Sequence, residues 1–87
     1  MTGRKRSSTT RKPRSPEEEL IARTTESILE AMKRRSVTKA ELARRTGTTN
    51  AYITQLLSGD RNLTLKTIAV VAEALNVSPR LTLLEND

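Results

Sequence analysis

One side of the segment spanning residues 49–58 consists of small and polar residues. Around an α-helix, at about 100° per residue, five side chains fall within about 140° of one another: Asn50, Ala51, Thr54, Gln55 and Ser58. The opposite side holds Tyr52, Ile53 and Leu56. The carboxamides of Asn and Gln can bond bidentately to adenine, and Ala or Thr methyl groups can contact the thymine methyl group. This pattern indicates a helix that reads base edges, although an ordinary solvated helix face would be equally polar.

The composition excludes several other kinds of chemistry. The chain of 87 residues contains no His and no Cys, and its only aromatic residue is one Tyr. Without thiolate or imidazole groups it can form no zinc finger, no disulfide and no nucleophile–base pair of Cys and His. We therefore expect no metal ion, no cofactor and no enzymatic activity. The longest apolar run, Ile68 to Ala72, is too short for a membrane span or a signal peptide, so we expect a cytoplasmic protein.

Basic residues are concentrated in two places. The net charge of +6 equals the charge of residues 1–16, where six bases occur without an acid: Arg4, Lys5, Arg6, Arg11, Lys12 and Arg14. This tail has too little apolar surface to fold, so residues 1–15 are expected to be a disordered basic arm that contacts DNA phosphates or merely solubilises the chain. The remainder is neutral overall, yet eight bases and two acids lie between Lys33 and Lys66.

Capping signals predict the helices that must position the polar side. Ser15 and Glu18 have the spacing of a capping box, which opens a helix over about residues 16–35. Thr38 and Glu41 have the same spacing and open a second helix. A chain with such closely spaced helix starts and few strand signals is expected to be all-α.

The second and third helices have the geometry of a helix-turn-helix. Gly47 can adopt the left-handed conformation of a tight turn, and Thr49 follows as the next N-cap. Ala43 is small where two helices must approach closely, and Ile53 and Leu56 face the core. In this arrangement the second helix of the pair enters the major groove of DNA.

The C-terminal part predicts one further helix and an ambiguous segment. Thr64 caps a fourth helix that ends near Asn76. The residues that follow could form a short fifth helix or a strand, and the apolar alternation favours the strand. Leu81, Leu83 and Leu84 would then form a dimer contact or close the domain's own core. The expected organisation is an arm over 1–15, a DNA-binding domain over 16–78 and a dimerisation segment or tail over 79–87.

From about Ile28 to Val77 the sequence resembles the Xre, Cro and phage-repressor family of helix-turn-helix regulators. The resemblance rests on family motif residues at the expected spacing: Thr38, Leu42, Ala43, Gly47, Ile53 and Gly59. It also rests on R-N-L-T-L-K-T-I-A-V-V-A-E-A-L-N-V, which is similar to the family's fourth helix. The resemblance implies a bundle of four or five helices, like that of lambda repressor, and sequence-specific DNA binding as a dimer on an inverted repeat.

The resemblance also implies roles for individual residues. The positions that match those nearest the bases are Thr49, Asn50, Ala51, Thr54 and Gln55. The positions that match backbone contacts are Lys39, Ser58, Arg61 and Asn62. Independently of the resemblance, the hydroxyl of Tyr52 could reach a phosphate, although a lone Tyr on the core side of a helix is more typical of packing.

Three functions remain open at this stage. The first is a dimeric transcriptional repressor of a bacterium, phage or prophage. The second is an antitoxin that binds a toxin and represses its own operon, since single-domain members of the family serve both roles. The third is a nucleoid-associated protein that binds any duplex through its basic arm, without sequence preference.

Overall fold

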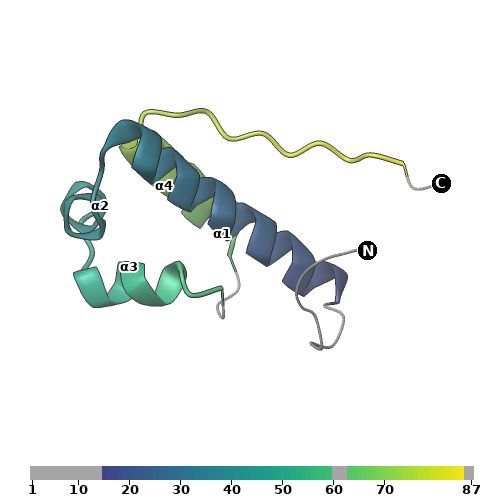
Figure 1. The fold of residues 1–87 in the computed structure, drawn as a ribbon, viewed down its shortest axis with the longest axis horizontal. Coiled ribbons are helices and arrows are strands. Elements are labelled where there is room, and N and C mark those ends of the chain that lie inside the picture. The colour runs from purple at the N-terminus through teal and green to yellow at the C-terminus, as the bar shows by residue number, and fades with distance from the viewer. Residues whose placement is uncertain (1–14, 60–62, 86–87) are drawn as a thin grey trace, which may run out of the picture.

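The computed structural model describes residues 15–59 and 63–85, and within them the fold is all-α (Figure 1). These residues form four helices and no strand: α1 (Pro16–Arg35), α2 (Lys39–Thr46), α3 (Asn50–Leu56) and α4 (Leu65–Ala74). The all-α class and the start of each helix are as the sequence predicts. No helix in this part of the chain has both the length and the apolar character that a bilayer span requires.

Each helix begins at a hydroxyl side chain. The N-cap hydroxyl oxygens accept hydrogen bonds from the main-chain N–H three residues onward, at 3.0 to 3.2 Å: Ser15, Thr38, Thr49 and Thr64. At the start of α1 the capping box is complete, because the main-chain N–H of Ser15 donates to Oε1 of Glu18 at 3.0 Å. Such caps satisfy N–H groups that have no partner within the helix.

Only one of the two hydrogen bonds of the second predicted capping box forms. Thr38 Oγ1 accepts the N–H of Glu41 at 3.1 Å, but the Glu41 carboxylate does not return to Thr38. It accepts hydrogen bonds from Arg44 and Arg45 one turn later instead. Two guanidinium donors outcompete one neutral amide, because hydrogen bonds between charged groups are the stronger ones.

The core lies where α2, α3 and α4 meet the C-terminal half of α1. Its three largest fully buried side chains come from different elements: Leu42 of α2, Ile53 of α3 and Leu75 at the end of α4. From α1, Ile28, Ala31 and Met32 join this cluster. One apolar cluster therefore fixes the position of α3 against the rest of the domain.

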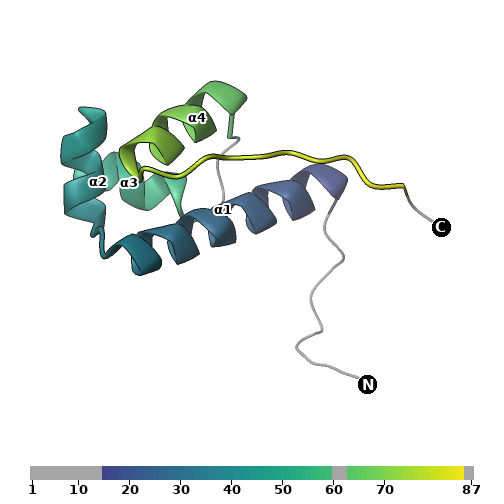
Figure 2. The same cartoon turned by 90° about the horizontal axis from the view of Figure 1, so that it is seen from above.

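The N-terminal half of α1 extends away from α2 and α3. The C-terminal segment leaves the end of α4 in the same general direction and draws apart from α1 in the view of Figure 1 (Figures 1 and 2). Residues 77–85 have no regular secondary structure, so neither the favoured strand nor the alternative fifth helix forms there. The described part of the chain contains no strand with which this segment could pair, and Pro79 has no N–H to donate. Within residues 15–59 and 63–85 the segment therefore has no partner with which to complete a strand.

Candidate nucleic-acid interface

The outer side of α3 is exposed along its whole length. The side chains that the sequence places on this side are all exposed. Four lie on α3, and the fifth, Ser58, follows the helix in the turn after Leu56: Asn50, Ala51, Thr54, Gln55 and Ser58. On the opposite side Ile53 is 0% exposed and Leu56 is 2% exposed. The buried pair anchors α3 to the core, so its small and polar residues face solvent on a firmly held helix.

A tight turn sets the angle between α2 and α3. Gly47 ends α2 with φ of 70°, a left-handed conformation that is strained for other residues. The N–H of Thr48 then donates to the carbonyl of Ala43 at 2.9 Å, and Ala43 itself is buried. Thr49 begins α3 immediately afterwards by accepting the N–H of Tyr52 at 3.0 Å. Every residue of the turn therefore has a role in orienting the exposed side of α3.

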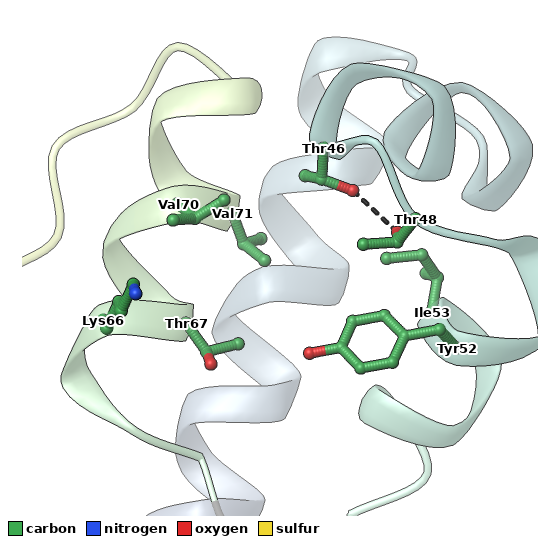
Figure 3. Close-up of a pocket in the computed structure, with 8 residues that line it drawn as sticks. All are labelled: Thr46, Thr48, Tyr52, Ile53, Lys66, Thr67, Val70 and Val71. Atoms are coloured by element: carbon green, nitrogen blue, oxygen red, sulfur yellow. Dashed lines mark hydrogen bonds between the residues drawn. The ribbon is translucent and has the colours of Figure 1, made fainter.

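Tyr52 lies on the inner side of α3, beside a pocket of about 300 Å³ (Figure 3). Its ring is half-buried against the core, and its hydroxyl points across the pocket towards α4. Thr46 and Thr48 line the same pocket, with their hydroxyl oxygens 2.8 Å apart. This orientation favours packing, the alternative that the sequence left open for Tyr52, over a phosphate contact.

The basic residues of α2 have different surroundings. Lys39 is exposed in the first turn, at the end of α2 where the resemblance implies a backbone contact. Arg44 and Arg45 both donate to the Glu41 carboxylate, and these hydrogen bonds lower the pKa of Glu41 from its ordinary 4.5 to about 2. In the other direction, the hydrogen bond with Glu41 raises the pKa of Arg44. Arg45 also donates from Nη1 to the carbonyl of Ala74 at 2.8 Å.

Some of the expected DNA contacts fall outside the described residues. Two residues expected to contact the DNA backbone, Arg61 and Asn62, lie outside them, and so do all six basic residues of the arm. Ser58 is described and exposed, and its hydroxyl donates to the carbonyl of Gln55 at 2.7 Å. Of the expected backbone contacts, the structure therefore places Lys39 and Ser58 in solvent at the two ends of the helix pair.

The arrangement of α2, the glycine turn and α3 is that of a helix-turn-helix DNA-binding domain. A family model described as helix-turn-helix matches residues 28–81, which is more than half of the chain. The chain belongs to this family, the helix-turn-helix regulators of Xre, Cro and phage-repressor type, and is a DNA-binding regulatory protein. Comparisons with curated proteins and with solved structures found no match.

Proposed function

We propose that this protein is a dimeric transcriptional repressor that reads the major groove of its operator with α3. The observation that carries the proposal is the contrast between the two sides of α3. One side presents exposed residues with base-reading chemistry, while Ile53 and Leu56 on the other side are buried. The family membership supports DNA binding by this element.

The proposed base contacts follow from the side-chain chemistry. Asn50 and Gln55 carry carboxamides that can each form two hydrogen bonds with one adenine. Ala51 and Thr54 carry methyl groups suited to the thymine methyl group, and Thr49 lies at the end of α3 that enters the groove first in this family of domains. Together they favour an A·T-containing half-site.

Contacts with the DNA backbone would come from residues around α3. We assign this role to Lys39 and Ser58, together with Arg61, Asn62 and the basic arm. These contacts fix the register of the domain on the duplex but carry no sequence information. A dimer would place two copies of α3 on half-sites about 34 Å apart, on one face of an inverted repeat in the cytoplasm or nucleoid.

Selection of binding sites from random duplexes tests this function directly. A palindromic consensus is expected for the unaltered protein. Asn50→Ala and Gln55→Ala should each relax the preference at one position, at a cost of about 1–3 kcal/mol for each lost bidentate contact. Glu26→Gln, an exposed change on α1, is the matched control and should leave the consensus unchanged. Recovery of the same consensus from both α3 variants would contradict the assignment of these readers.

An antitoxin is the second candidate function, and the exposed leucines of the C-terminal segment favour it. Leu83 and Leu84 lie in solvent next to the domain, where a toxin could cover them. The product of the neighbouring reading frame distinguishes the repressor from the antitoxin. A neighbouring gene whose product arrests growth when expressed alone, and is neutralised by this protein, would establish the antitoxin function.

A further inference from the structure

Exposed leucines gather at the end of the domain that lies away from the α2–α3 turn. Leu65, at the start of α4, is 72% exposed, and Leu20 on α1 is half-exposed. In the C-terminal segment Leu83 is 89% exposed and Leu84 is 81% exposed. Scattered exposed leucines are ordinary, but Leu20 and Leu65 line one groove, and the segment that carries Leu83 and Leu84 reaches the same groove through Leu81.

A groove separates α1 from α4 at this end. Its volume is about 460 Å³, and its lining is mainly apolar: Leu20, Ile21, Leu63, Leu65, Ile68 and Leu81, with Glu17 and Thr24. An apolar cavity of about 150 Å³ already accommodates benzene. The groove therefore has room for at least two bulky apolar side chains beyond those that line it.

We propose that this groove receives Leu83 and Leu84 of a second copy of the chain, and that two copies exchange their C-terminal segments symmetrically. The proposal rests on the proposed dimeric repressor and adds the two surfaces that meet. In a twofold dimer each such contact occurs twice, so the groove of each copy is filled by the segment of the other.

The structure supports a second copy as the occupant because the chain supplies both complementary surfaces. Leu81 already lies at the groove, so a leucine of this very segment fits its lining. Beyond that point the segment draws away from α1 (Figure 1), and Leu83 and Leu84 stay largely exposed.

The position of the groove is compatible with DNA binding. Its α1 residues belong to the N-terminal half of that helix, which extends away from α2 and α3 (Figure 1). A second copy docked there would leave the exposed side of α3 free. Dimerisation and base reading can therefore be measured as separate properties.

A charge-exchange experiment tests the proposal. Leu83→Glu alters the segment and Leu65→Lys alters the groove; both side chains are largely exposed, so the fold should tolerate the changes. Sedimentation equilibrium of each variant alone should show a dimer dissociation constant raised about tenfold or more, because apolar contacts are lost twice per dimer. An equimolar mixture should regain dimers. In the mixed dimer, the unaltered groove of the Leu83→Glu chain receives the unaltered segment of the Leu65→Lys chain. At the other contact, the introduced carboxylate of one chain meets the introduced ammonium group of the other.

The controls separate this proposal from its alternatives. Leu29→Glu changes an exposed leucine of α1 outside the groove and should leave the dissociation constant unchanged. If the segment instead closes the groove of its own chain, mixing the variants will restore nothing, and the proposal is overturned. Dimers of unaltered strength in both variants, or a wild-type protein that stays monomeric, would also overturn it. Binding to a single half-site does not require a dimer, so both variants should bind it as the unaltered protein does. Failure of the unaltered protein to prefer such a half-site over unrelated DNA would count against the proposed function instead.

Discussion

Nη1 of Arg45 donates a hydrogen bond to the main-chain carbonyl of Ala74 at 2.8 Å, which ties α2 to the end of α4. The same guanidinium binds the Glu41 carboxylate through Nε at 2.8 Å. One side chain thereby joins the first helix of the helix-turn-helix to the last helix of the bundle. The carbonyl end of a helix carries partial negative charge, which favours a cation there.

Replacing Arg45 should therefore destabilise the domain. Arg45→Gln removes the link to Ala74, and we expect a loss of about 1 kcal/mol, reduced from the full value of a charged hydrogen bond because the side chain is partly exposed. For a domain of this size that corresponds to a melting temperature lower by about 4–8 °C. Thermal unfolding followed by circular dichroism measures it.

Arg44 provides the matched control for that experiment. It lies on the same helix and binds the same carboxylate, but its side chain is more exposed, and its hydrogen bonds are to Glu41 rather than to α4. Arg44→Gln should lower the melting temperature less than Arg45→Gln does. Equal losses in the two variants would mean that the bond to Ala74 contributes nothing measurable.

The stabilising effect of Glu41 should depend on pH. Hydrogen bonds from Arg44 and Arg45 lower its pKa from 4.5 to about 2 in the folded state, so folding favours the charged carboxylate. Its contribution is therefore fully present above pH 4.5 and is lost as the pH falls towards 2. The difference in unfolding free energy between the wild type and Glu41→Gln should shrink over that interval. A difference that stays constant from about pH 6 to pH 2 would show that Glu41 does not stabilise the fold in this way.

Local signals in the sequence were sufficient to predict the helices. The caps at Thr38, Thr49 and Thr64 act over three residues, so the sequence alone shows both partners. The period of α3 likewise separates the buried Ile53 and Leu56 from the residues left in solvent. Short-range geometry fixes such features whatever the rest of the fold does.

Interactions between distant parts of the chain could not be predicted in this way. Arg45 and Ala74 are 29 residues apart, and no local pattern links them. The Glu41 carboxylate could accept a hydrogen bond from the main-chain N–H of Thr38 or from Arg44 and Arg45. The local sequence pattern does not show which of these donors it takes. The conformation of residues 77–85 depends on a pairing partner that the described chain does not contain. Which residues of α3 contact bases is likewise a property of the complex with DNA.

Thr25 is a buried polar residue that a periodic pattern could have identified. It lies between Ile21 and Ile28 at helical spacing, it is 5% exposed, and its hydroxyl has no hydrogen-bond partner among the described residues. An unpaired buried hydroxyl is costly, so Thr25→Val should stabilise the domain by about 1 kcal/mol in urea denaturation. Thr24→Val is the control. The Thr24 hydroxyl donates to the Leu20 carbonyl at 2.8 Å, so its removal should not stabilise the domain. Destabilisation by Thr25→Val would indicate that a bound water satisfies its hydroxyl.

The basic arm should contribute to DNA affinity through phosphate contacts. Deletion of residues 1–14 removes its six bases and keeps Ser15, which caps α1. The slope of the logarithm of operator affinity against the logarithm of salt concentration should become less steep, by up to about five if all six bases contact phosphates. Full-length protein with these six bases changed to Gln is the matched control and should behave like the deletion. A slope unaffected by both changes would mean that the arm is not at the DNA.

Thr49 combines a structural role with a proposed reading role, and two substitutions can separate them. Its hydroxyl caps α3, so Thr49→Ala should cost about 1 kcal/mol of stability, whereas Thr49→Ser keeps the cap. Thr64→Ala removes the equivalent cap of α4 and should cause a similar loss of stability without changing which operator bases are preferred. If Thr49 also contacts the bases, Thr49→Ser should alter that preference while its urea denaturation curve stays like that of the wild type. A preference unchanged by Thr49→Ser would show that the methyl group, which Ser lacks, does not contact the operator, and reading by that group would be ruled out.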